Sequence, residues 1–338
     1  MLNDRKIISM ISNRSLELIL LPTEQCNFRC TYCYEDFSIG KMKKNIVEAI
    51  KKLILQRIDT LDVLQIGWFG GEPLAAKDIV YDISSYVQQL RMKYPNVQYL
   101  SNMTTNGFQL KEDIFRKLIS LDVKSFQVSL DGTEKMHNLT RLRLNGSGSF
   151  NTIWHNLLSA KNTDIDFSIT LRIHITPDNV DDMYELIDLI KVNFGYDPRF
   201  TVFFKAIETL GGPNAGTFKV IRGKDKAEIL QQLYDYLGPA MKVKKLNDNG
   251  PYVCYAAKTN SLVIRADGKI GKCTVALSDD RNSLGTLLDD GTLEIASDKL
   301  ALWTRGISSQ NLVELSCPMY QLPTLKSALQ SIPVVLQG

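Results

Sequence analysis

Three cysteines lie within eight residues near the start of the chain, in the stretch "CNFRCTYC". Cys26, Cys30 and Cys33 have the spacing Cys-x3-Cys-x2-Cys, and the loop around them contains no histidine. A structural zinc site needs four ligands, usually from paired Cys-x2-Cys units. A [4Fe–4S] cluster held by three thiolates leaves one iron without a protein ligand, so that this iron can bind another molecule. The spacing therefore favours such a cluster over a zinc loop that takes a distant fourth ligand.

The composition excludes several other classes of protein. The chain has 338 residues, 44% of them apolar, which suffices for one large domain and a smaller one. A net charge of +3 gives no reason to expect a nucleic-acid partner. No run approaches the roughly 18 to 20 apolar residues that span a bilayer, and the N-terminus lacks the apolar block of a secretion signal. We therefore expect a cytoplasmic protein without a membrane partner, whose cysteines are ligands or core residues.

Short apolar runs alternate with helical patterns over the first 210 or so residues. Strands are expected at 16–21, 63–69, 97–105, 124–130, 167–175 and 200–206, and helices at about 43–59, 78–93, 110–120, 150–161 and 178–194, the last with Asp178 as N-cap. The apolar strands resemble parallel strands that are covered on both faces. Six strands with intervening helices predict a parallel α/β array, either an open barrel or a doubly wound sheet.

Unusual residues follow the first four predicted strands. The segments "TEQCNFRC", "GGEP", "TTNG" and "SLDG" come after these strands in that order. Because functional loops lie at the carboxyl ends of parallel strands, all four are expected on one rim. Turn formation is an adequate explanation for Asn106 and Asp131 on that rim. The three histidines fit no metal spacing, and His174 is interpreted as structural.

The cysteine motif resembles the signature of the radical S-adenosylmethionine (SAM) superfamily, in which an aromatic residue such as Tyr32 precedes the third cysteine. The resemblance implies a partial (β/α)6 TIM-like barrel. It also implies an open iron that chelates the amino and carboxylate groups of SAM. Reduction then yields a 5′-deoxyadenosyl radical that abstracts hydrogen from the substrate.

The same resemblance assigns further SAM contacts. Gly70, Gly71 and Glu72 would receive the SAM amino group through backbone and carboxylate. Ser129 would contact the ribose region, and Arg141 the methionine carboxylate. A surface arginine on a helical turn is the alternative for Arg141. No general base or hydrogen donor can be assigned.

The remaining cysteines are Cys254, Cys273 and Cys317. Their spacing, with a hairpin signal at Asp267-Gly268, resembles the start of a SPASM domain or its shortened relative, the twitch domain. Three cysteines cannot hold the two auxiliary clusters of a full SPASM domain. Two alternatives stay open for these cysteines. They hold one auxiliary iron–sulfur cluster with a non-cysteine fourth ligand, or they hold no cluster. We predict a core domain at 1–215, followed by a linker helix and an α+β SPASM/twitch-like domain at 216–338.

Relatives with this architecture mostly modify peptides or proteins. The resemblance implies a radical SAM oxidoreductase that matures a ribosomal peptide by crosslinking, thioether formation or epimerisation. Its reductant would be flavodoxin or ferredoxin, and either the core or a separate partner would bind the leader peptide. Oxidation of a small molecule and sulfatase-type maturation of Cys or Ser are alternatives. Thr274 stands where sulfatase maturases carry an acid, which weighs against the latter. A non-catalytic metal-binding regulator is the remaining alternative.

Overall fold

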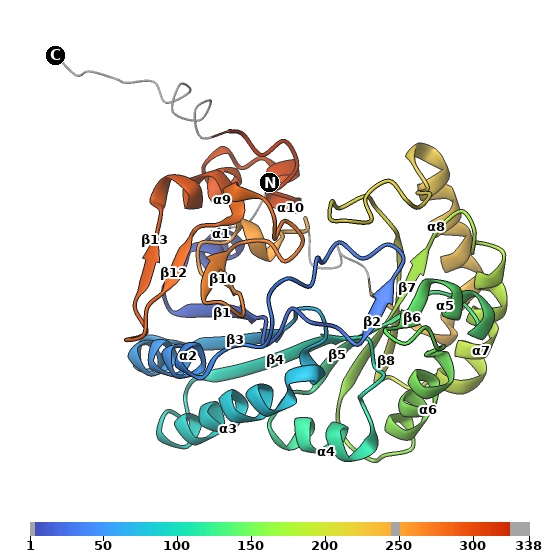
Figure 1. Cartoon of the computed structure of the whole chain (residues 1–338), viewed down its shortest axis with the longest axis horizontal. Helices are drawn as coiled ribbons and strands as arrows, with labels where there is room; N and C mark the ends of the chain where they lie inside the picture. The colour runs from blue at the N-terminus through green and yellow to red at the C-terminus, as the bar shows by residue number, and fades with distance from the viewer. Residues whose placement is uncertain (1–3, 245–250, 325–338) are drawn as a thin grey trace.

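The computed structural model describes residues 4–244 and 251–324, and its centre is a curved parallel sheet (Figure 1). Neighbouring strands in this sheet follow the order of the chain: β1 (Ser15–Leu20), β3 (Val63–Trp68), β4 (Gln98–Thr105), β5 (Ser125–Leu130), β7 (Ser168–Ile175) and β8 (Phe200–Ala206). All five pairs are parallel. A doubly wound sheet would reverse direction along its strand order, so the partial barrel is confirmed.

Helices connect these strands and cover the outer face of the sheet (Figure 1). They are α2 (Lys44–Arg57), α3 (Lys77–Lys93), α4 (Glu112–Ser120), α6 (Phe150–Lys161) and α7 (Asp182–Phe194), and α8 (Gly223–Leu237) leads to β9 (Lys242–Val243). The predicted strands and most helices agree with the observed bounds within two residues. The sequence analysis missed the short elements α1 (Asp4–Ile11), α5 (Glu134–Thr140), β2 (Phe28–Cys30) and β6 (Arg141–Arg143).

The helix expected from residue 178 begins later, at Asp182. Residues 176–179 instead form a turn, in which Asn179 donates its backbone N–H to the carbonyl of Thr176 (3.3 Å). The Asn179 side chain also donates to the backbone carbonyls of Asp131 (2.7 Å) and His174 (3.0 Å). Asp178 is therefore no N-cap, because this turn is held against the ends of two strands.

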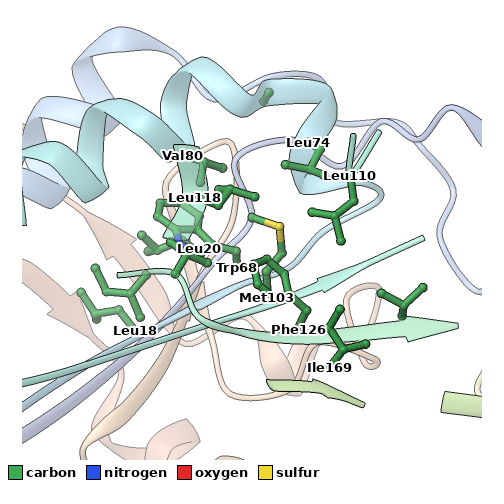
Figure 2. Packing of buried hydrophobic residues seen from close by; sticks show 14 of the residues in the cluster. Leu18, Leu20, Trp68, Leu74, Val80, Met103, Leu110, Leu118, Phe126 and Ile169 are labelled. Atoms are coloured by element: carbon green, nitrogen blue, oxygen red, sulfur yellow. The ribbon is translucent and has the colours of Figure 1, made fainter. Parts of the chain in front are cut away.

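The outer face of the sheet forms the hydrophobic core. Figure 2 shows Leu20, Trp68 and Phe126 from three strands packed below Val80 of α3 and Leu118 of α4. These side chains are at most 2% exposed. Because alternate residues of a strand point to opposite faces, the other half of each strand faces inward.

The inner face of β4, β5 and β7 carries mostly polar residues, so the interpretation of the strands as near-continuous apolar runs is wrong there. Gly67, Asn102 and Ser125 form one row across β3, β4 and β5. Ser129 and Arg172 lie side by side on β5 and β7. Side chains of this kind cannot form the packed apolar interior of a closed barrel. They suit a lumen that receives polar ligands.

The C-terminal segment extends the same sheet. Strand β10 (Ser261–Ile264) pairs with β1 in parallel, and β11 (Lys269–Gly271), β12 (Gly285–Leu287) and β13 (Leu293–Ile295) follow in antiparallel order. Gly268, with φ of +85°, makes the predicted hairpin turn. The helices α9 (Ser297–Ser309) and α10 (Leu312–Ser316) pack beside it. The domain boundary at 215/216 stays a prediction, and parts of the second predicted domain, 245–250 and 325–338, lie outside the described residues.

None of the helices within residues 4–244 and 251–324 has the length and apolar character that a bilayer crossing requires.

A buried ion pair joins the loop after β1 to the hairpin. Nε and one terminal nitrogen of Arg265 donate to the two carboxylate oxygens of Glu24, whose side chain is 1% exposed. Arg265 also donates to the carbonyl of Leu277 (2.8 Å). The pair therefore holds the cysteine loop and the C-terminal segment together.

We expect Arg265→Ala to lower the free energy of unfolding by about 3–5 kcal/mol, because the Glu24 carboxylate would remain buried without a counter-charge. Chemical unfolding of both proteins measures the difference. Lys41→Ala, which removes an exposed pair with Asp78, is the control and should cost less than about 1 kcal/mol. Equal losses in the two variants would contradict this account.

Candidate functional site

The three N-terminal cysteines lie around one loop at the carboxyl end of β1. Cys30 ends β2 and Cys33 donates its backbone N–H to the Cys30 carbonyl (3.1 Å), while Cys26 Sγ accepts from the N–H of Phe28 (3.3 Å). Burial is the main cause that raises the pKa of Cys26 and of Cys33 to about 12. Thiols of this kind hold their protons tightly unless a metal ion displaces the proton from the sulfur.

The three thiols suit a cluster and not a single metal ion. Among the described residues, no three His, Cys, Asp or Glu side chains surround a single point closely enough for one metal ion. A four-iron cluster differs, because each thiolate binds a different iron and the sulfurs need not converge. The three thiols interact electrostatically with one another, and a backbone N–H already points at one sulfur. Three soft ligands in a half-buried loop therefore fit an iron–sulfur cluster.

The "GGEP" segment packs directly against this loop. The backbone N–H groups of Gly71 and Glu72 donate to the carbonyls of Thr23 (3.2 Å) and Gln25 (3.1 Å). A Cβ on Gly71 would lie 2.5 Å from the carbonyl oxygen of Gln25, so no larger residue fits. Gly70 has φ of +114°, which favours glycine. The two glycines therefore allow the close approach that fixes the cysteine loop.

The Glu72 carboxylate is fully buried and bonds to its own chain. Oε1 accepts from the N–H of Leu74 (3.0 Å) and the hydroxyl of Thr105 (2.8 Å), and Oε2 from the N–H of Asn106 (2.7 Å). The Asn106 amide in turn donates to Asn27 Oδ1 (2.8 Å). Asn106 is thus more than a turn residue, because it links the third rim loop to the cysteine loop. Contact of Gly70, Gly71 and Glu72 with a SAM amino group stays a prediction.

A buried polar network lies beside Cys30. Tyr32 donates its hydroxyl to Asp131 Oδ2 (2.6 Å) and accepts from an Arg141 terminal nitrogen (2.8 Å). Arg141 pairs in register with Cys30 between β2 and β6, and its charge lies 3.8 Å from Asp131. Burial raises the pKa of Asp131, but the Arg141 charge and a hydrogen bond with His174 outweigh it, and the net shift is downward.

Arg141 is 6% exposed, which excludes the surface-arginine alternative. Its Nε is buried without a hydrogen-bond partner among the described residues. An unpartnered buried donor beside the cysteines is consistent with an anionic group of a ligand at this point. Ser129, the other predicted SAM contact, is 7% exposed and lies on the inner face of β5. Their contacts with SAM remain predictions.

His174 connects this network to a residue that the sequence analysis did not single out. Its Nε2 accepts from Arg172 Nε (3.0 Å), and a guanidinium only donates. Nδ1 therefore carries the hydrogen and donates to Asp131 Oδ1 (3.1 Å). Arg172 and His174 alternate on one strand and so share its inner face. That period-two spacing is the signal in the sequence that could have identified Arg172.

The C-terminal cysteines also approach one another. Besides burial, Cys273 and Cys317 both raise the pKa of Cys254, Cys317 also raises that of Cys273, and Cys273 Sγ accepts from the N–H of Val275 (3.4 Å). Burial raises the pKa of Cys254 to about 11. The N–H of Cys254 donates to the carbonyl of Leu315 (2.8 Å), which brings α10 and the following Cys317 close to Cys254. The structure thus gathers the second set but does not test whether it binds a cluster.

The comparisons with known proteins agree with this geometry. Residues 20–190, more than half of the chain, match the family model described as "Radical SAM superfamily". The chain is 26% identical over 293 residues to a cysteine-type anaerobic sulfatase-maturating enzyme of Clostridium novyi, covering 79% of this chain and 75% of that one. It is also 26% identical over 271 residues to a GTP 3',8-cyclase of Nostoc punctiforme, covering 74% and 78%. It spans 60% of the length of the Clostridium perfringens sulfatase-maturating enzymes that it matches.

Two solved structures share the fold. "Native anSMEcpe with bound AdoMet and Cp18Cys peptide" matches with a TM-score of 0.65 and 19% identity, over 85% of this chain and 80% of that one. Streptococcus suis SuiB bound to its precursor peptide SuiA matches with a TM-score of 0.56 and 18% identity, over 97% and 77%. Both matches extend beyond the barrel into the C-terminal segment, because they cover more residues than the barrel contains.

The buried His137 provides a pH-dependent test of the network. Its Nδ1 accepts from the N–H of Asp131 (3.3 Å), so Nε2–H donates to Ser149 Oγ (3.1 Å). Burial lowers the pKa of His137 to about 3. Below pH 6.5 the His137 imidazole takes up a proton in the unfolded chain but stays neutral in the folded state. The free energy of unfolding therefore falls as the pH falls. Between pH 6.5 and 5 this amounts to about 2 kcal/mol.

We expect His137→Asn to remove this contribution, so that the variant loses less stability than wild type over that pH range. Urea unfolding at pH 6.5 and pH 5 measures both differences. His155→Asn changes an exposed histidine on α6 and should behave as wild type. If His137→Asn retains the wild-type pH dependence, the histidine is not held neutral.

Proposed function

Because this chain belongs to the radical SAM superfamily, we propose that it modifies a peptide substrate in the maturation of a ribosomal peptide. The superfamily uses a [4Fe–4S] cluster and SAM, and the chain is accordingly an enzyme. When bound, these cofactors supply a 5′-deoxyadenosyl radical that abstracts hydrogen from the substrate. The proposed electron donor is flavodoxin or ferredoxin.

The residues of the site have complementary roles in this proposal. Cys26, Cys30 and Cys33 hold the cluster, and the glycines of the "GGEP" segment bring backbone close to it. The bond between Tyr32 and Asp131 orders the loop after Cys30, and Arg141 supplies a buried positive charge for the SAM carboxylate. Ser129 faces the lumen, where a ribose hydroxyl would find a hydrogen-bond partner.

The arrangement of the two cysteine sets is the observation that carries the peptide proposal. Tyr34 lies between them: burial first, then the charges of Glu35, Cys33 and Cys273, raise the pKa of Tyr34. Tyr34 therefore lies near a cysteine of each set. The fold is shared with two enzymes whose solved structures hold peptides, which supports a peptide in the lumen. Either the core binds the peptide directly or a separate partner presents the leader.

Sulfatase-type maturation is less well supported than other peptide chemistry. Thr274, at the position of the maturases' acid, exchanges hydrogen bonds with Tyr255 through its hydroxyl (2.8 Å) and its N–H (3.0 Å). The nearby Asp279 pairs with Arg281 (2.6 Å), which lowers the pKa of that carboxyl. Because both side chains are engaged in these contacts, neither is free to act as a general base. The likeness to a GTP 3',8-cyclase keeps a small-molecule substrate as the second candidate.

The anaerobically reconstituted protein, given dithionite and SAM, should release 5′-deoxyadenosine. The triple variant Cys26→Ala, Cys30→Ala, Cys33→Ala should release none, because the iron that binds SAM is lost. Chromatography of the quenched reaction measures the product. Modification of a short peptide encoded beside the gene, detected as a mass change, tests the substrate class. Release of deoxyadenosine with no modified peptide would favour the small-molecule candidate.

We further propose that Cys254, Cys273 and Cys317 hold one auxiliary cluster, since at least one of these sulfurs accepts a backbone N–H and the others lie beside it. The N-terminal triple variant should then retain about four irons per chain, and a matched C-terminal triple alanine variant should lose about four. Anaerobic iron and sulfide analysis measures both. If the N-terminal triple variant contains no iron, the C-terminal cysteines bind no cluster.

A further inference from the structure

Arg172 presents a positive charge to the lumen. It lies in the middle of β7, in register with Ser129 on β5 and Phe203 on β8, so its side chain points to the inner face. Its guanidinium carbon lies 5.9 Å from the centre of the Phe203 ring. The residue is half-buried. The cationic side chain in the lumen is therefore partly shielded from water.

Its orientation is held by a chain of hydrogen bonds. Nε donates to His174 Nε2, and His174 Nδ1 donates to Asp131, as described above. A guanidinium has five N–H groups. Among the described residues, the bond to His174 is the one hydrogen bond of the Arg172 side chain, which leaves both terminal nitrogens for another group.

No carboxylate within the described ranges forms an ion pair with Arg172, whereas Arg199 and Arg265 each have one. The nearby Glu208 carboxylate already accepts from Lys205 (2.7 Å) and from Lys226. Burial is the main cause that lowers the pKa of Arg172. A desolvated cation without a counter-charge is costly unless an anion joins it.

We propose that Arg172 binds a carboxylate of the substrate through its two terminal nitrogens, with His174 and Asp131 as positioning residues. This assignment rests on the proposed function, because it places the substrate in the lumen above Ser129. A planar fork of two N–H donors matches the two oxygens of a carboxylate. Arg141 lies at Cys30 and is the separate charge for SAM, so the two arginines serve different ligands.

The experiment compares the binding of three N-acetylated probe peptides to the anaerobic holoenzyme in the presence of SAM. The first is acetyl-Gly-Glu-Gly-amide, the second replaces Glu by Gln, and the third is acetyl-Gly-Gly-Gly with a free C-terminal carboxylate. Dissociation constants come from saturation-transfer NMR titrations. Wild type should bind one of the two carboxylate probes about tenfold or more tighter than the Gln probe, and which one it prefers identifies a side-chain or a C-terminal carboxylate.

Arg172→Gln should abolish this preference, and Arg172→Lys, which keeps the charge but not the fork, should retain part of it. Lys205→Gln is the matched control. It removes one positive charge from the inner face of the next strand, but that charge is already neutralised by Glu208. This variant should keep the wild-type preference. Iron content and SAM affinity of every variant should equal those of wild type.

Three results would overturn the assignment: no carboxylate preference in wild type, a preference that survives Arg172→Gln, or an equal loss in Lys205→Gln. Loss of SAM affinity in Arg172→Gln would also overturn it, because Arg172 would then serve the SAM carboxylate. These binding results are separate from deoxyadenosine release and peptide modification. Failure of the proposed function is therefore distinguishable from failure of this assignment.

Discussion

The close approach of two backbone segments is the constraint on which the site depends. The cysteine loop leaves β1 and lies against the loop that follows β3, and two N–H groups of that loop bond to its carbonyls. Side chains at Gly70 or Gly71 would collide with those carbonyls. The loop after β4 joins the same assembly through the buried carboxylate of Glu72. Three loops from three strands thus become one rigid rim, and the thiols take their positions from it.

A second constraint is the cost of burying charge. The core on the outer face is dry and apolar, whereas Arg172 and His174 lie on the inner face of β7, with Asp131 after β5 and Arg141 on β6 beside them. Asp131 has its partners in this network, but donors of both arginines do not. An enzyme tolerates such incomplete pairing where a ligand completes it. The inner face is therefore organised for binding at the expense of stability.

Local patterns predicted most elements, because apolar periodicity and turn residues act over short distances. All six barrel strands were found, and the hairpin at Gly268 was found from its turn signal. The prediction failed where tertiary contacts compete with local preference. Asp178 has the chemistry of an N-cap, but Asn179 holds the preceding turn to Asp131, so α7 starts four residues later. The strands resembled apolar runs because their polar inner residues alternate with large apolar residues that face the core.

The sequence alone determined the family chemistry, since the spacing of Cys26, Cys30 and Cys33 and the order of the rim motifs are properties of the linear chain. It also determined that the rim residues would meet, because parallel strands place their carboxyl ends together. Only the tertiary structure decided the partners of each side chain. It joined β10 to β1, set Tyr34 between two groups of cysteines, and left Arg172 without an acid. The physical reason is that burial and pairing of charge depend on residues distant in sequence, which no local pattern records.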